Sequence, residues 1–154
     1  IPNNAAIIES NAFSAVENIL QTYIETNSID TAETNQWTPQ EWVHFVRNFP
    51  EDISIDQLQH LDDTFNFTAS TNSYISMVWY EQAILNNYHG NMVDAKISEF
   101  LNTVGRRWYV TTLFKAFKKA DRVNEALEIY KTARQNYHSV TTNTVDELLE
   151  YSAI

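Results

Sequence analysis

The run Gly105-Arg106-Arg107-Trp108-Tyr109 contains the residues best suited to bind a ligand. It places one of the two glycines of this 154-residue chain beside two adjacent arginines. Gly105 is expected to end one helix, and Arg106 stands at the expected start of the next. An anion bound there would meet a guanidinium fork together with the free N–H groups and positive dipole of a helix N-terminus. The run therefore predicts a site for one small anion. The alternative is that both arginines pair with surface acids of neighbouring helices.

The charge distribution sets this run apart from the rest of the chain. The formal net charge is −10; residues 1–95 contain thirteen acids and one base, Arg47, whereas residues 96–154 contain nine bases and seven acids. Nucleic acid or an anionic membrane would require a basic stripe, so we expect neither as a partner. No stretch approaches the ~20 apolar residues of a membrane span. Cysteine is absent, which favours the cytoplasm and leaves a periplasmic location open.

Other residues capable of chemistry lack the spacing that their chemistry requires. The four histidines are too scattered for zinc, which needs three or four ligands brought together. Glu41 and His44 match one Glu-x-x-His step of a di-iron bundle, but the step has no second copy. Asp62 and Asp63 would point about 100° apart on a helix, so we expect them on a solvated acidic face. We expect no catalytic residue, metal or cofactor in this chain.

Helices must position these residues, because two glycines and three prolines cannot supply the turns of a sheet. Capping boxes predict helix starts near residue 39, from Thr38 to Glu41, and near residue 55, from Ser54 to Gln57. Further starts are predicted at residues 70–72, Asn91, Asp121 and Thr144 with Glu147. Gly105 is the expected end of a helix that its one-sided apolar pattern places at residues 91–104.

Segments of this length, joined by short polar turns, must pack against one another. We expect about eight antiparallel helices in one domain, the first near residues 4–26, arranged as a bundle or as a two-layer coil of helix pairs. Residues 25–37 lack apolar periodicity and are expected to form the longest loop. Trp79 and Trp42, at helical spacing from other apolar residues, are expected in the core.

Motifs spread along residues 57–141 add a resemblance to these patterns. They are Gln57-Leu58 with Leu61-Asp62, Phe67 to Asn72, Ile75 with Trp79, Gly105-Arg106-Arg107, Leu113-Phe114-Lys115, and Tyr137-His138 with Val140-Thr141. In this order they resemble the C-terminal domain of the leukotriene hydrolase type of zinc aminopeptidase. The resemblance implies an all-α fold in which helix pairs form a two-layer, right-handed coil of the armadillo/HEAT type.

The resemblance also implies a function for the whole protein. Residues 1–154 would be a single helical C-terminal domain, a fragment of a larger bacterial enzyme that releases N-terminal residues from short peptides. The zinc ion and its H-E-x-x-H helix would belong to an absent catalytic domain, so this chain alone would be inactive. Its partners would be the catalytic and N-terminal domains of the same polypeptide and a short peptide. The alternative is a stand-alone helical-repeat module that binds another protein.

Within this family the arginine after the glycine binds the terminal carboxylate of the substrate, and Arg106 matches that position. A basic residue two positions further assists it, but Trp108 stands there in this chain, which weakens the expectation of carboxylate anchoring and, most of all, of epoxide hydrolysis. Arg107 would replace the lost charge only if its side chain points into the cleft. A second departure is Ser139, where the family usually has proline after Tyr-His; a helix start at residue 141 does not require that proline.

Overall fold

The structure is a computed structural model that describes the backbone of residues 4–152 and the side chains of residues 11–152. The described part contains nine α-helices, three short 3₁₀ helices and no strand. The α-helices are α1 (Asn4–Thr26), α2 (Thr31–Thr34), α3 (Pro39–Arg47), α4 (Ile55–Phe65), α5 (Ser73–Leu85), α6 (Val93–Thr103), α7 (Arg107–Lys119), α8 (Val123–Ala133) and α9 (Ser139–Leu149). The 3₁₀ helices are η1 (Phe67–Ala69), η2 (Gly90–Met92) and η3 (Arg134–Asn136). The all-α prediction is confirmed, and the short helix α2 lies inside the segment expected to be a loop.

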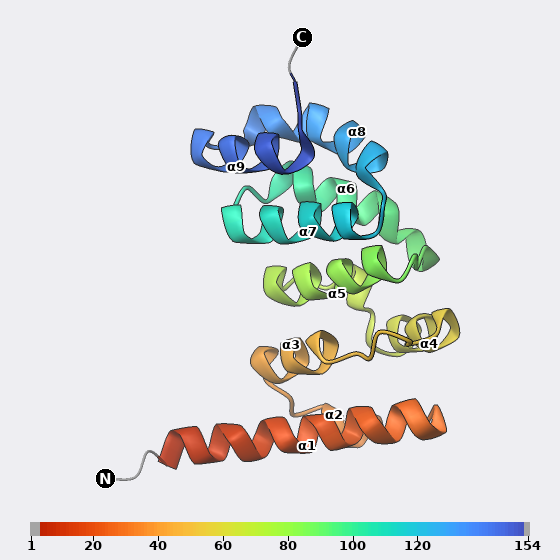
Figure 1. The fold of residues 1–154 in the computed structure, drawn as a ribbon. Helices are drawn as coiled ribbons and strands as arrows, with labels where there is room; N and C mark the ends of the chain where they lie inside the picture. The colour runs from red at the N-terminus through yellow and green to blue at the C-terminus, as the bar shows by residue number, and fades with distance from the viewer. Residues whose placement is uncertain (1–3, 153–154) are drawn as a thin grey trace.

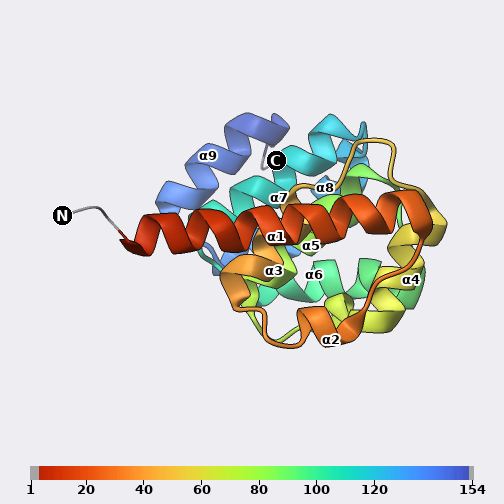
Figure 2. The same cartoon turned by 90° about the horizontal axis from the view of Figure 1, so that it is seen from below.

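The helices form two layers (Figure 1). In one layer α1, α3, α5, α7 and α9 stack in chain order, each against the next. In the other layer α6 packs against α8, and η1 joins α4 to α5 and α6. Figure 2 views the stack from the α1 end, with α1 lying across the other helices. The two layers agree with the expected coil of helix pairs, whereas the right-handed, armadillo-like curvature stays a prediction. No described helix combines the length and the apolar character needed to cross a membrane.

Local capping explains where most helices begin. The capping boxes of Thr38 and Ser54 are both present, and in each the backbone N–H of the N-cap residue donates the reciprocal bond to the side chain three residues on. These boxes satisfy N–H groups that would otherwise lack partners in the first turn. The Asn72 side chain accepts from two N–H groups at the start of α5, within the predicted range. The starts expected at Asn91 and Asp121 lie two residues before the actual first residues of α6 and α8.

The expected start of the last helix at Thr144 is wrong. α9 begins at Ser139, before both Thr144 and residue 141, and His138 Nδ1 accepts a hydrogen bond of 3.2 Å from the Val140 N–H. Ser139 therefore occupies the first helical position, where proline would also fit. Thr144 lies inside the helix, and its hydroxyl donates to the Val140 carbonyl at 3.1 Å. The Thr and Glu pair resembles a capping box, but an earlier cap had already started the helix.

Several helices are followed by a non-glycine residue in the left-handed conformation that usually favours glycine. Five residues that follow α-helices adopt positive φ without being glycine: Asn27, Asn66, Asn87, Asp121 and Glu150. Asparagine and aspartate tolerate this left-handed conformation better than most residues. Gly105 lies two residues beyond the end of α6, which ends at Thr103 with Val104 as its C-cap, and no described glycine has positive φ.

Aromatic side chains dominate the core between the layers. Trp79 is fully buried, as predicted, and contacts Phe49, Phe67 and Tyr88 at ring-centroid distances of 6.4, 5.0 and 5.5 Å. Trp42 is only partly buried and packs against the edge of this core. Aromatic rings bury a large area each and prefer such edge-to-face or offset contacts, so they hold the stacked helices together.

The prediction of a solvated face for Asp62 is wrong. Its side chain is 1% exposed and accepts four hydrogen bonds. The donors are the Thr68 N–H at 2.9 Å, the Thr68 hydroxyl at 2.6 Å, the Tyr88 hydroxyl at 2.6 Å and the Asn91 amide at 3.0 Å. Trp79 Nε1 in turn donates to the Thr68 hydroxyl at 3.0 Å. Burial and the bond to Asp62 raise the pKa of Tyr88, so its hydroxyl remains a donor. The buried carboxylate thus ties α4, η1 and η2 together.

Gly90 lies against this cluster, and its replacement should disturb the packing. A Cβ at residue 90 would come closer than 3.0 Å to Gln59 Oε1 and to the buried Tyr88 ring. We expect Gly90→Ala to lower the free energy of unfolding by about 1–3 kcal/mol, the usual cost of overpacking, measured by urea denaturation.

Gly105→Ala is the matched control, since the nearest atom to a Cβ there is the Asn136 carbonyl oxygen at 3.9 Å. That substitution should leave stability unchanged or raise it by up to about 1 kcal/mol through the unfolded state. Equal losses in the two variants would contradict this account of Gly90.

Candidate anion-binding site

The turn between α6 and α7 presents Arg106 at the N-terminus of α7. Arg106 is the N-cap residue, with an extended backbone (φ −63°, ψ 121°), and its carbonyl accepts a bond of 3.1 Å from the Val110 N–H. No side chain caps the first turn, and no acidic residue lies in it. The N–H groups of this turn therefore have no partner within the helix and add a positive partial charge. The backbone here is that of an open helix N-terminus, and anion binding at it stays a prediction.

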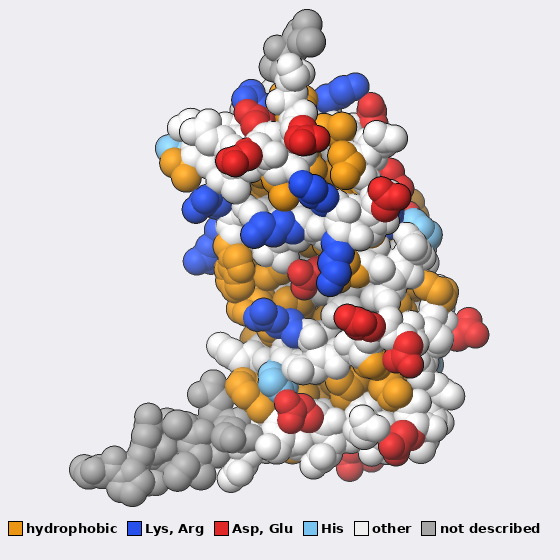
Figure 3. All heavy atoms as spheres, viewed as in Figure 1, with side chains coloured by type: hydrophobic (Ala, Val, Ile, Leu, Met, Phe, Trp, Pro, Cys, Tyr) orange, Lys and Arg blue, Asp and Glu red, His pale blue; other side chains and the backbone are white. Residues whose placement is uncertain are grey.

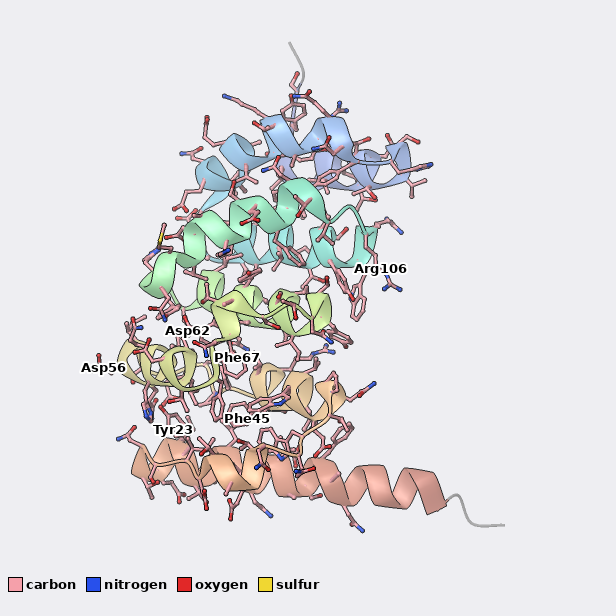
Figure 4. The ribbon with its side chains drawn as sticks, turned by 180° about the vertical axis from the view of Figure 1, so that it is seen from behind. Tyr23, Phe45, Asp56, Asp62, Phe67 and Arg106 are labelled. Atoms are coloured by element: carbon pink, nitrogen blue, oxygen red, sulfur yellow. The ribbon has the colours of Figure 1, made fainter. Side chains whose placement is uncertain are left out.

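The Arg106 side chain is exposed and has no ion pair with any described acid. Its guanidinium lies over the ring of Tyr109, with Cζ 5.4 Å from the ring centroid. Figure 4 shows Arg106 pointing outward at the edge of the domain, at the opposite side of the view from Asp62 and Asp56. The Arg106 guanidinium donates no hydrogen bond to a described residue, so its N–H donors stay available to a ligand.

Arg107 is oriented differently, against the last helix. Its Nε and Nη2 donate to the Thr144 hydroxyl at 3.2 and 3.0 Å. The side chain thereby joins α7 to α9 through a neutral partner and keeps its positive charge. Arg106 and Arg107 line one hollow of about 610 Å³ together with Trp108, Thr111, Thr112, Lys115 and Thr144. The described side chains that line this hollow include no acid.

Trp108 forms the aromatic wall of the same hollow. Its side chain is 46% exposed and meets Tyr74 edge to face at a centroid distance of 4.9 Å, and Tyr109 at 5.4 Å. Tyr74 also accepts a hydrogen bond from Arg47 Nη1 at 3.3 Å. The hollow beside Tyr74, of about 380 Å³, is lined by Phe13, His44 and Arg47 among others. Sequence analysis missed Tyr74 and Arg47, because no local pattern links residues that lie on α5 and α3 to the start of α7.

The described arginines divide into two groups by their partners. Arg122 pairs with Glu125 at 2.7 Å and Arg134 with Asp146 at 2.7 Å. Arg47, Arg106 and Arg107 form no ion pair with a described acid, and they instead meet Tyr74, Tyr109 and Thr144, respectively. Figure 3 shows Lys and Arg side chains gathered over the middle of one face, above and below an apolar area. The expected pairing with surface acids therefore does not occur for the two arginines of the turn among residues 11–152.

The carboxyl of Glu81, on α5, interacts electrostatically with two neighbouring bases. Burial raises the pKa of Glu81, and the charges of Arg47 and Lys119 lower it in part. Glu81 is thus coupled electrostatically to Arg47 and Lys119.

The remaining candidates from the sequence have structural partners. Glu41 caps α3, and His44 Nε2 lies 3.0 Å from Glu17 Oε1. His60 hydrogen-bonds Tyr23 at 2.9 Å. Among the side chains of residues 11–152, no group of three His, Asp or Glu is placed to hold a metal ion. The Glu41 and His44 step is therefore not assembled into a metal site with other described residues.

Comparison with known proteins gives this helical domain its class. A model of the family described as leukotriene A4 hydrolase, C-terminal, matches residues 37–149, a range that includes α3 to α9 and the turn at Arg106. The fold and the matched range define an all-helical domain of the kind that ends leukotriene A4 hydrolase. The chain belongs to this family of C-terminal domains, which confirms the resemblance noted in the sequence. A bacterial source stays an expectation.

Two fungal relatives show similarity over most of the chain. Leucine aminopeptidase 2 of Chaetomium globosum is 26% identical over 123 residues, covering 75% of this chain and 19% of that protein. Leucine aminopeptidase 2 of Neurospora crassa is 26% identical over 128 residues, covering 79% of this chain and 18% of that protein. The chain therefore spans about a fifth of the length of the curated relatives that it matches.

Proposed function

We propose that this chain is the non-catalytic C-terminal domain of a zinc aminopeptidase that releases N-terminal residues from short peptides. In this proposal, the domain walls the active-site cleft and directs Arg106 toward the terminal carboxylate of the substrate. One observation carries the proposal: within the family match, an exposed guanidinium without a described acidic partner stands at the uncapped N-terminus of α7. That combination suits a bidentate carboxylate.

The proposal assigns the chemistry to the remainder of a longer polypeptide. The relatives are about five times as long as the matched segment, which leaves room in them for further domains. The described residues of this chain offer no fitting ligand set for zinc. Zinc would therefore be held by a catalytic domain, where it would act as a Lewis acid and activate water. Arg106 would bind and orient the peptide from the opposite wall.

The first test uses the isolated chain and its coding sequence. Mixed with zinc and aminoacyl anilides, the isolated chain is expected to show no turnover above background, because the catalytic groups lie elsewhere. An upstream H-E-x-x-H motif in the same reading frame is the matching expectation. Turnover by the chain alone, or a start codon at Ile1, would overturn the proposal; the start codon would favour a stand-alone helical adaptor.

A further inference from the structure

Trp108 is an exposed aromatic side chain with a fixed orientation. Large apolar side chains exposed in the described part of the chain are Ile55, Met92, Trp108 and Val140, of which only Trp108 is aromatic. Tyr74 meets the indole at an interplanar angle of 77° and Tyr109 at 40°, so two rings hold it from α5 and from its own helix. A ligand that packs on a ring held in place loses little additional side-chain entropy on binding.

The indole and the Arg106 guanidinium flank the same tyrosine. Arg106 lies over the Tyr109 ring, Trp108 contacts that ring, and both side chains line the hollow at the start of α7. The site therefore places a cation and an apolar surface next to each other, with Thr112 along the same helix. A simple inorganic anion would use only the cation.

The C-terminal residue of a peptide uses both features. Its carboxylate and its side chain leave the same Cα, so a carboxylate bound by a guanidinium keeps the side chain within a few Å. We propose that Trp108 selects peptides whose last residue has a large apolar side chain, with aromatic residues favoured; this inference rests on the proposed carboxylate role of Arg106. Two aromatic rings attract each other more strongly than the burial of their apolar area alone accounts for. Trp108 can therefore discriminate among terminal residues.

The test uses the full-length protein and four tripeptides, Leu-Gly-Phe and Leu-Gly-Ala, each as free acid and as C-terminal amide. The wild-type kcat/KM is expected to favour the Phe acid over the Ala acid. In Trp108→Ala this preference should fall about 2- to 12-fold, whereas Trp108→Phe should keep most of it. Ile55→Ala removes an exposed apolar side chain at the first residue of α4, next to Asp56, which Figure 4 shows at the opposite side of the view from Arg106, and should leave the preference unchanged.

The role of Trp108 and the role of Arg106 can be refuted separately. A ratio of Phe acid to Ala acid that is the same in the wild type and in Trp108→Ala would overturn the role of Trp108. A ratio of acid to amide near one in the wild type would overturn the carboxylate role of Arg106, whatever the first ratio shows. Tryptophan fluorescence and far-UV circular dichroism check that each variant is folded like the wild type.

Discussion

Arg106→Ala in the full-length protein is expected to lower kcat/KM for tripeptides with a free C-terminus by about 5- to 150-fold. This range corresponds to about 1–3 kcal/mol, the usual contribution of a hydrogen bond to a charged group. The guanidinium has no described acidic partner, so no acid of residues 11–152 would be left unpaired by the substitution. The loss should therefore measure a contact with the substrate. Steady-state kinetics on Leu-Gly-Phe and Leu-Gly-Ala provide the measurement.

Matched substrates and a matched variant separate this effect from a general defect. Aminoacyl anilides and C-terminal amides carry no carboxylate, so Arg106→Ala should change their kcat/KM much less. Arg107→Ala removes the neighbouring charge, which the structure holds at Thr144, and should cost the acids less than Arg106→Ala does. Equal losses for acids and amides in Arg106→Ala would contradict a carboxylate role and leave this turn a scaffold.

Asp62→Ala is expected to cause the largest loss of stability, about 3–5 kcal/mol of the free energy of unfolding. The substitution removes the acceptor for the Thr68, Tyr88 and Asn91 donors, and Asp62 itself is 1% exposed. Buried donors left without an acceptor keep their full desolvation cost, and the small side chain also leaves a cavity. Urea denaturation of the 154-residue chain, followed by circular dichroism, measures this loss.

Asp63→Ala is the matched control, one residue along the same helix. Asp63 is exposed, and hydrogen bonds from Asn91 and Gln59 lower the pKa of its carboxyl. Its removal should shift the midpoint of unfolding only slightly, because water replaces the lost bonds. Asp62→Asn keeps the shape of the side chain and should fall between the two. If the midpoint shift in Asp63→Ala were as large as that in Asp62→Ala, the conclusion that buried Asp62 holds α4, η1 and η2 together would be refuted.

Trp108 gives the site a chemistry that the family pattern does not predict. Where the resemblance leads us to expect an assisting basic residue, a half-exposed indole stands beside Arg106. Two donors of Arg107 bind Thr144, while its side chain lines the same hollow as Arg106, and its replacement of the lost charge stays a prediction. Apolar contact between Trp108 and the last residue of the peptide would then take the place of the binding by a second cation that the resemblance implies.

Features that depend on neighbours in the sequence were predictable. The capping boxes of α3 and α4 each involve residues three positions apart, and both were found as expected. The apolar stripe of residues 91–104 likewise predicted α6. Errors arose where several local signals competed, as at Thr144. There, His138 had already capped α9, which begins at Ser139, five residues before Thr144. Helix existence was therefore more predictable than the last helix boundary.

Features that depend on distant contacts were not predictable. Asp62 is buried because Tyr88 and Asn91, 26 and 29 residues away, supply donors. Arg107 reaches Thr144 across 37 residues, and Arg47 reaches Tyr74 across 27. No spacing in the sequence marks such pairs. Adjacent acids such as Asp62 and Asp63 look alike until packing buries one and leaves the other in water.

The sequence by itself determined the helical elements, the family and the position of Arg106 at a helix start, because caps, apolar periodicity and motifs are written in short ranges of residues. Only the tertiary structure decided which arginines are neutralised: Arg122 and Arg134 have acidic partners, whereas Arg106 and Arg107 have neutral ones. It also decided that Trp108 stays exposed beside Arg106. Ion pairing and burial depend on which helices meet, and that is settled by packing of whole elements rather than by neighbours along the chain.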